Sequence, residues 1–238
     1  MKPWLLIRKP VLISMATNIA LIRLLQLVSP GLPIGMYSYS QGMERAVDDK
    51  WLVNEQDCYE WLSGILHYAQ TPTDAAYLSR LHAAWSQRDS AAVQYWSSEL
   101  IACRESQELR DEDRQTGQAL ARLLVNLEMP EAQPWLRHPD ATLAGLFSLA
   151  AVKWGLNCQD TLSAYLWGWL ENQVLSAVKL VPLGQVAGQQ LLYRLATEIP
   201  ASVEQALALS DQNLGGSAWG QVVASGRHEM QYSRLFRS

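Results

Sequence analysis

Apolar residues recur at spacings of one, three and four along most of this chain, which is the pattern of one buried face of an α-helix. In the segment 54–70, the apolar stripe consists of Trp61, Leu62, Ile65, Leu66 and Ala69. No segment alternates strictly between apolar and polar residues, and no repeat of fixed period occurs. The pattern therefore predicts an all-α protein, a single-domain bundle of about nine or ten helices.

Prolines and capping residues divide this pattern into helices. Asn54 is a predicted N-cap, and Thr71-Pro72 is expected to end one helix and restart the chain for the next. Asp140 and Asp160 are the predicted caps of two nearly all-apolar helices that should form the centre of the bundle. The main predicted helices are 54–70, 72–88, 90–128, 141–153, 161–181 and 185–198.

Residues 29–42, called the connector below, cannot continue a helix. They contain two prolines and three glycines, which stop a helix and remove side-chain bulk. Ser38 followed by Gln41 has the form of a capping box, so a new helix is predicted to start there and to include Trp51. A simpler interpretation is an ordinary turn whose aromatic residues pack on a neighbouring helix.

Composition places the chain among globular proteins. Of its 238 residues, 49% are apolar and 18% charged, with no shift in composition that marks a domain boundary. The net charge of −4 does not indicate a protein that binds nucleic acid. The apolar helices lack the lysine-rich face of a membrane-surface protein. Three scattered cysteines fit reduced thiols in a cytoplasmic protein better than a disulfide framework.

The first residues faintly resemble a secretory leader, because they are apolar and carry three cations. The uncharged run 10–22 is too short to cross a bilayer, and no small-residue cleavage pattern accompanies it. We expect residues 1–14 to be a poorly ordered extension and Met15 to be the native start. The helical domain would then span 15–226, followed by a tail at 227–238.

A charged block, residues 104–114, interrupts the apolar pattern. Arg104 and Glu108, and likewise Asp111 and Arg114, stand at helical neighbour spacing, which is typical of a solvated helix face. We expect this block to face water. A contact with another helix or with a partner is the alternative.

Motifs that would indicate an enzyme are absent from the sequence. It has no phosphate-binding loop, no dinucleotide-binding glycine pattern, no nucleophile elbow and no closely spaced Cys or His pair for a metal. We therefore expect no catalytic residues, no metal site and no cofactor. Distant cysteines and histidines that converge only in the fold are the alternative, and an enzyme built on them is the second candidate function.

The last twelve residues, 227–238, have the composition of an interface anchor. They contain three arginines against one glutamate, together with tyrosine, leucine and phenylalanine, and His228 is the histidine most suited to a functional role. Lys179 is the single charge near the end of a long apolar helix. It either extends its ammonium group to water at the helix C-terminus or contacts a partner.

Both ends of the chain resemble the UreF-type urease accessory proteins. The similarity lies in the run from Leu24 to Glu44, in the Cys103–Arg110 string, around Lys179, and in the last eight residues, QYSRLFRS. Met36 departs from the family, which usually has a second small residue at this position. The resemblance covers nearly the whole chain.

The resemblance implies an all-α, homodimer-forming adaptor that docks on the accessory protein UreD, also called UreH. Together they would recruit the UreG GTPase to urease apoprotein for nickel insertion and lysine carbamylation, so GTP hydrolysis would belong to UreG. Which surface meets which partner stays open, as does any passage of nickel through the chain. The candidate partner-binding residues are Pro30, Pro33, Gly35, Tyr37, Ser38, Tyr39, Ser40, Gly42, Glu44, Lys179, Arg227, His228, Gln231, Tyr232, Ser233, Arg234, Leu235 and Phe236.

Overall fold

The computed structural model describes residues 19–238, and the expected extension 1–14 and the start at Met15 lie outside them. Helices are the only regular secondary structure of the described chain, which contains no strand, so the all-α prediction is confirmed. Its α-helices are α1 (Ile19–Leu27), α2 (Met43–Asp48), α3 (Glu55–Ile65), α4 (Ala76–Gln87), α5 (Ser90–Ala102), α6 (Gln107–Asn126), α7 (Leu143–Lys153), α8 (Cys158–Leu180), α9 (Gln185–Ala196), α10 (Ile199–Ala208) and α11 (Trp219–His228).

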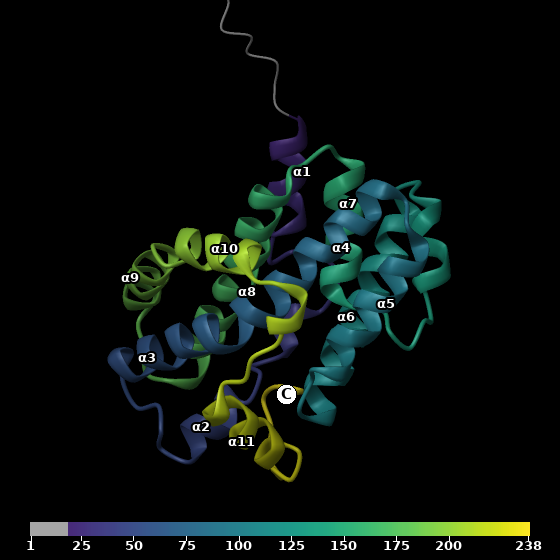
Figure 1. Ribbon diagram of the computed structural model, residues 1–238. Helices are drawn as coiled ribbons and strands as arrows, with labels where there is room; N and C mark the ends of the chain where they lie inside the picture. The colour runs from purple at the N-terminus through teal and green to yellow at the C-terminus, as the bar shows by residue number, and fades with distance from the viewer. Residues whose placement is uncertain (1–18) are drawn as a thin grey trace, which may run out of the picture.

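Two groups of helices pack around one long helical rod (Figure 1). The rod consists of α3, a π-helix η2 (Leu66–Ala75) and α4. Helices α5, α6 and α7 gather around its α4 half, while α8, α9 and α10 lie along its α3 and η2 half. Helices α2 and α11 pack against each other at one end of the bundle, opposite α1.

The predicted break at Thr71-Pro72 is wrong, because the helical rod continues through Pro72. Proline lacks the N–H of a helical ladder and its ring crowds the preceding turn, but a wider π-helical turn can accommodate both defects. The Thr71 hydroxyl also donates to the carbonyl oxygen of Leu66 at 2.7 Å. With α3 and α4 joined in this way, the described chain has ten separate α-helical segments, in agreement with the predicted number.

The single helix expected over 90–128 is two helices, separated by a turn after Ala102. Ser106 caps the second one, since its Oγ accepts a hydrogen bond from the Leu109 amide at 3.2 Å. The break lets Ser106 cap the second helix and lets Arg104, in the turn, point inward, as described below.

Capping also differs from expectation at the two central helices. The predicted cap Asn54 is confirmed, with its Oδ1 3.0 Å from the Asp57 amide. Thr142, rather than Asp140, caps α7, and Asn157, rather than Asp160, caps α8. The predicted central position is confirmed for α7, because nine of its eleven residues are buried. Helix α8 buries one side along its whole length.

Candidate functional site

The connector is a series of tight turns that ends at α2. Gly35 has a φ of +83° and leads into a short 3-10 turn, η1 (Met36–Ser38). The capping-box prediction is wrong, because α2 begins at Met43 after Gly42, and Trp51 lies beyond its end. Ser40 makes a side-chain hydrogen bond to the first turn of α2, because its Oγ accepts from the Glu44 amide at 3.2 Å.

Gly42 brings the connector into direct contact with α11. Its φ of +84° is a conformation that side-chain-bearing residues rarely adopt, and a Cβ added there would lie 2.7 Å from the Ser225 amide nitrogen. Only glycine therefore allows the two backbones to approach this closely. The predicted connector and the segment that precedes the predicted tail meet at this point.

The tail folds back onto the connector, so the two ends of the chain that carry the candidate residues form one surface (Figure 1). The buried Glu44 carboxylate accepts hydrogen bonds from the Leu235 amide at 2.6 Å and the Phe236 amide at 2.8 Å. The Ser38 carbonyl oxygen accepts one from the Arg237 amide at 2.8 Å. Backbone donors of the tail are thus satisfied by the connector and α2.

His228 lies between two carboxylates beneath the tail. Its side chain is fully buried, with Nδ1 2.7 Å from Glu108 Oε2 and Nε2 3.3 Å from Glu44 Oε2. Arg234 Nη1 donates to the other oxygen of Glu108 at 2.7 Å. We call Glu44, Glu108, His228 and Arg234 the tail clamp. His228 belongs to α11 and holds the tail to the body of the protein.

The remaining candidate residues divide into inward-facing and outward-facing groups. Tyr39 is buried and its hydroxyl donates to Gln115 Oε1 at 3.0 Å, whereas Phe236 is buried with the Lys179 Nζ 5.5 Å from its ring centre. Arg227 forms a surface ion pair with Asp49 at 3.0 Å. The outward-facing candidates are Pro30, Pro33, Tyr37, Lys179, Arg227, Tyr232, Ser233, Arg234 and Leu235.

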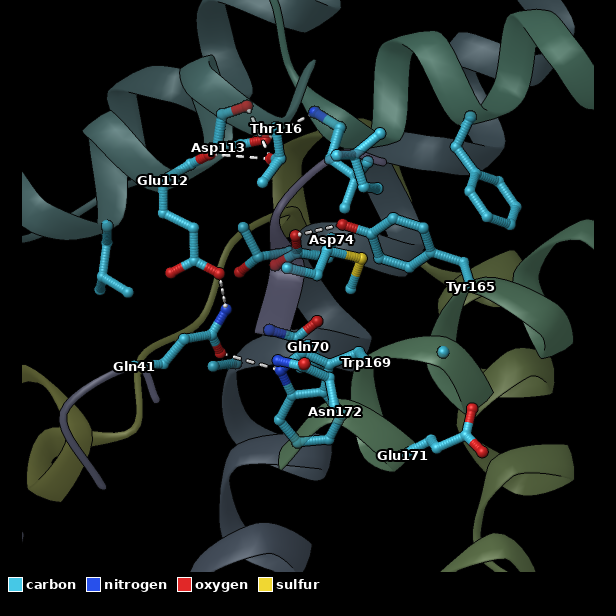
Figure 2. A pocket seen from close by; sticks show the side chains of 18 of the residues that line it. Gln41, Gln70, Asp74, Glu112, Asp113, Thr116, Tyr165, Trp169, Glu171 and Asn172 are labelled. Carbon is cyan, nitrogen blue, oxygen red and sulfur yellow. Dashed lines mark hydrogen bonds between the residues drawn. The ribbon is translucent and has the colours of Figure 1, made fainter. Parts of the chain in front are cut away.

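A pocket of about 80 Å³, lined by both apolar and polar side chains, lies beside the connector and reaches into the centre of the bundle (Figure 2). Gln41 joins the connector to it: its Nε2 donates to Glu112 Oε1 at 2.8 Å, and its Oε1 accepts from the Trp169 indole at 2.9 Å. The π-helix contributes Gln70, whose side chain is buried and whose Oε1 has no protein partner. The pocket is thus lined by several elements that are distant in sequence.

The charged block is not wholly a solvated face, because Arg104, whose side chain is 13% exposed, turns inward and lines this pocket. It binds Asp74 at 2.6 Å and Asp113 at 2.7 Å, and we call these three residues the core hub. Burial alone would lower the pKa of Arg104, but the two carboxylates raise it well above its usual value. The Asp111–Arg114 pair is confirmed, whereas Glu108 belongs to the tail clamp instead of pairing with Arg104.

Glu112 is the second buried acid of the same helix. Its side chain lines the pocket and receives hydrogen bonds from Gln41 and from the Ser238 hydroxyl, the latter at 3.1 Å. Burial raises the pKa of Glu112 to about 7, and the two hydrogen bonds oppose this rise. The carboxyl group therefore changes its charge near neutral pH.

The sequence reasoning missed most residues of this pocket. Local patterns do not identify them, because Gln41, Asp74 and Trp169 gain their roles from partners at least thirty positions away. Gln70 lines the pocket with an oxygen that has no protein partner. Within residues 19–238, no group of three His, Cys, Asp or Glu side chains is placed to hold a metal ion. None of the described helices combines the length and apolar character needed to cross a membrane.

Comparison with known proteins gives consistent matches over most of the chain. Residues 52–196 match the family model described as UreF. Over 216 residues the chain is 54% identical to the urease accessory protein UreF of Alkalilimnicola ehrlichii, which covers 91% of this chain and 95% of that protein. Proteins of the same name from Alcanivorax borkumensis and Hahella chejuensis are 44% and 41% identical, over 93% and 92% of this chain and 99% of each relative.

Proposed function

Because the chain belongs to the UreF family of urease accessory proteins, we propose that it is a non-catalytic adaptor in urease maturation. It binds the accessory protein UreD, also called UreH, and recruits the UreG GTPase to urease apoprotein for nickel insertion. The partners and the nickel step come from the family resemblance stated above. The active chemistry then belongs to UreG and urease, in keeping with the absence of a phosphate-binding loop from this sequence.

The docked tail is the observation that best supports an adaptor. It holds Met230, Tyr232 and Leu235 at the surface with 87%, 102% and 66% of their area exposed, while the residues between and beside them anchor it. Exposed apolar and aromatic side chains on a held backbone lose little entropy on binding, which is typical of an interface. Lys179, whose Nζ lies 5.5 Å from the Phe236 ring centre, and the exposed Arg237 add positive charge to this surface.

The competing enzyme hypothesis gains no support from the placement of the histidines. His67 bonds to Glu198, His82 to the Leu156 carbonyl oxygen, and His138 to Gln94. The fourth, His228, is held by the tail clamp. Each imidazole thus has a structural partner other than a cysteine. A convergent Cys–His pair would have to form by rearrangement of these contacts.

The proposal includes a homodimer in the cytoplasm, as the family resemblance implies. The exposed Ile19, Ile22 and Leu25 of α1 give the described chain an apolar helix face that a second copy could cover. Sedimentation of the purified protein at micromolar concentration tests this part. A monomer would contradict it.

Co-expression with UreD and UreG tests the adaptor itself. The full chain should elute with both partners, and a chain ending at Gly226 should not, because it loses the whole tail. Tyr232→Ala is the sharper variant, since Tyr232 is fully exposed and its loss should leave the fold intact. Tyr193→Ala is the matched control, because Tyr193 is a tyrosine of α9 that is 80% exposed and lies outside the candidate residues, and this variant should retain the complex. Failure of the full chain to form any complex would overturn the proposal.

A further inference from the structure

The pocket of Figure 2 contains a buried hydrogen-bond acceptor that the protein itself does not use. Gln70 is 4% exposed, its side chain lines the pocket, and its Oε1 has no hydrogen-bond partner. A buried carbonyl oxygen without a partner costs free energy, so this oxygen is suited to a donor from a bound molecule. Gln70 also belongs to the π-helix η2, and π-helical turns often occur at functional sites.

The charged groups that line this pocket are unbalanced. Five carboxylates of the described residues border it, and they are those of Asp74, Glu105, Glu112, Asp113 and Glu171. Arg104 is the only cation among the described residues of the wall, and its guanidinium is already shared between Asp74 and Asp113. Glu112 receives hydrogen bonds only from neutral donors, one in the connector and one in the tail. The pocket therefore favours a guest with positive charge.

The size and the walls of the pocket favour a small molecule over a single ion. Its volume of about 80 Å³ is several times the roughly 10–15 Å³ that one water molecule requires. The side chains of Phe147, Tyr165 and Trp169 line it, and aromatic rings attract organic cations and can cover a short hydrocarbon part. The wall also includes the exposed side chains of Tyr37 and Glu105, which gives a path from solvent.

We propose that this pocket binds a small organic cation with several N–H donors, of the guanidinium or primary-amine class, between Gln70, Asp74 and Glu112. Figure 2 shows these three side chains around the same space. The cation donates to Gln70 Oε1 and to Glu112, which uses two of the roughly four acceptor positions of a carboxylate. Such a site needs no partner protein, so it stands apart from the proposed adaptor function.

NMR of the full chain tests the site with methylguanidinium as the probe and methylurea as its uncharged counterpart. The reporter is the indole N–H of Trp169, which lines the pocket and donates to Gln41, and the variant Trp169→Phe identifies its signal. The titration is run at constant ionic strength and at pH 8, above the pKa of about 7 to which burial raises Glu112. Methylguanidinium should shift the signal saturably, and methylurea should bind at least about tenfold more weakly. The indole of Trp135, which does not line the pocket, should not shift.

Two variants of the pocket sharpen the test. Gln70→Leu removes the unpartnered acceptor and should weaken methylguanidinium binding at least about fivefold. The same change should leave the free energy of unfolding no lower than that of the wild type, because a buried group without a partner is lost. Glu112→Gln keeps the shape of the side chain but removes its charge, and should weaken binding about tenfold or more.

Glu171→Gln is the matched control. Glu171 borders the same pocket, but Figure 2 shows its carboxyl group turned away from Gln70 and Glu112, so this variant should bind the probe like the wild type. A wild-type response to methylguanidinium no stronger than that to methylurea would overturn the proposal. Wild-type affinity in both Gln70→Leu and Glu112→Gln would also overturn it. Because no partner protein takes part, neither result bears on the proposed adaptor.

Discussion

The core hub and the tail clamp each pair an arginine with carboxylates, but the two arginines differ in exposure. In the hub, the side chains of Arg104, Asp74 and Asp113 are 13%, 4% and 5% exposed. In the clamp, Arg234 is 33% exposed and pairs with Glu108, which is 12% exposed. An ion pair without solvent is costly to break, whereas one that water can reach is worth little by itself.

The two clusters also differ in what they hold together. The hub connects the turn before α6 to η2, to the Leu143 amide at the start of α7, at 2.7 Å from Asp113, and to the Tyr165 hydroxyl on α8, at 3.1 Å from Asp74. The clamp holds only the tail, residues 227–238, against the body of the protein. Loss of the hub should therefore affect the whole fold, and loss of the clamp only the local position of the tail.

The largest effect is expected for Arg104→Met. This change leaves Asp74 and Asp113 buried without their cation, which should lower the free energy of unfolding by about 3–5 kcal/mol. Urea unfolding measures it. Arg122→Ala, an exposed arginine on the same helix, should change this free energy by less than about 0.5 kcal/mol. Equal stabilities of the two variants would contradict the role of the hub.

Gly42→Ala should come next, with a loss of about 1–3 kcal/mol in the free energy of unfolding. The new Cβ would be strained by the positive φ and would collide with the Ser225 backbone. Gly226→Ala is the matched control in α11, since its Cβ would meet no atom within 4 Å and should stabilise the helix by about 0.5–1 kcal/mol. Thermal unfolding of the two variants tests the close approach of the Gly42 and Ser225 backbones. A Gly42→Ala protein as stable as the wild type would rule it out.

An effect that builds up gradually with pH is expected from the titration of Glu112. Because burial raises its pKa to about 7, this group stabilises the fold fully below the ordinary value of 4.5, and its contribution is lost as the pH rises through 7. The loss is at most about 1.4 kcal/mol per pH unit. The difference in free energy of unfolding between wild type and Glu112→Gln, measured across this range, isolates the contribution. A difference that does not vary with pH would refute it.

The smallest change in global stability is expected for Phe236→Ala. The ring is 4% exposed, but it belongs to the tail, so the variant should release the tail while unfolding changes by less than about 1 kcal/mol. Limited trypsin digestion should then cleave faster after Arg234. Tyr232→Ala, which removes an exposed ring from the same segment, should leave the cleavage rate unchanged. Equal rates in both variants would show that Phe236 does not hold the tail.

The candidate site was partly accessible from the sequence. The connector stands out by its prolines and glycines and the tail by its composition, and the structure brings these segments together through Glu44 and His228. Arg104 shows where this reasoning fails. Its spacing from Glu108 predicts a helical pair, but its partners are Asp74, thirty residues earlier, and Asp113, nine residues later.

The sequence by itself determined the helical class, the family and the helices α7, α8 and α9, because helical periodicity and motif order are local properties of the chain. The tertiary structure alone decided which polar groups are buried. The turn after Ala102, the helical path through Pro72 and the burial of Glu112 depend on contacts between segments far apart in sequence. Such contacts outweigh the tenths of a kcal/mol that separate local alternatives, and local spacing does not reveal them.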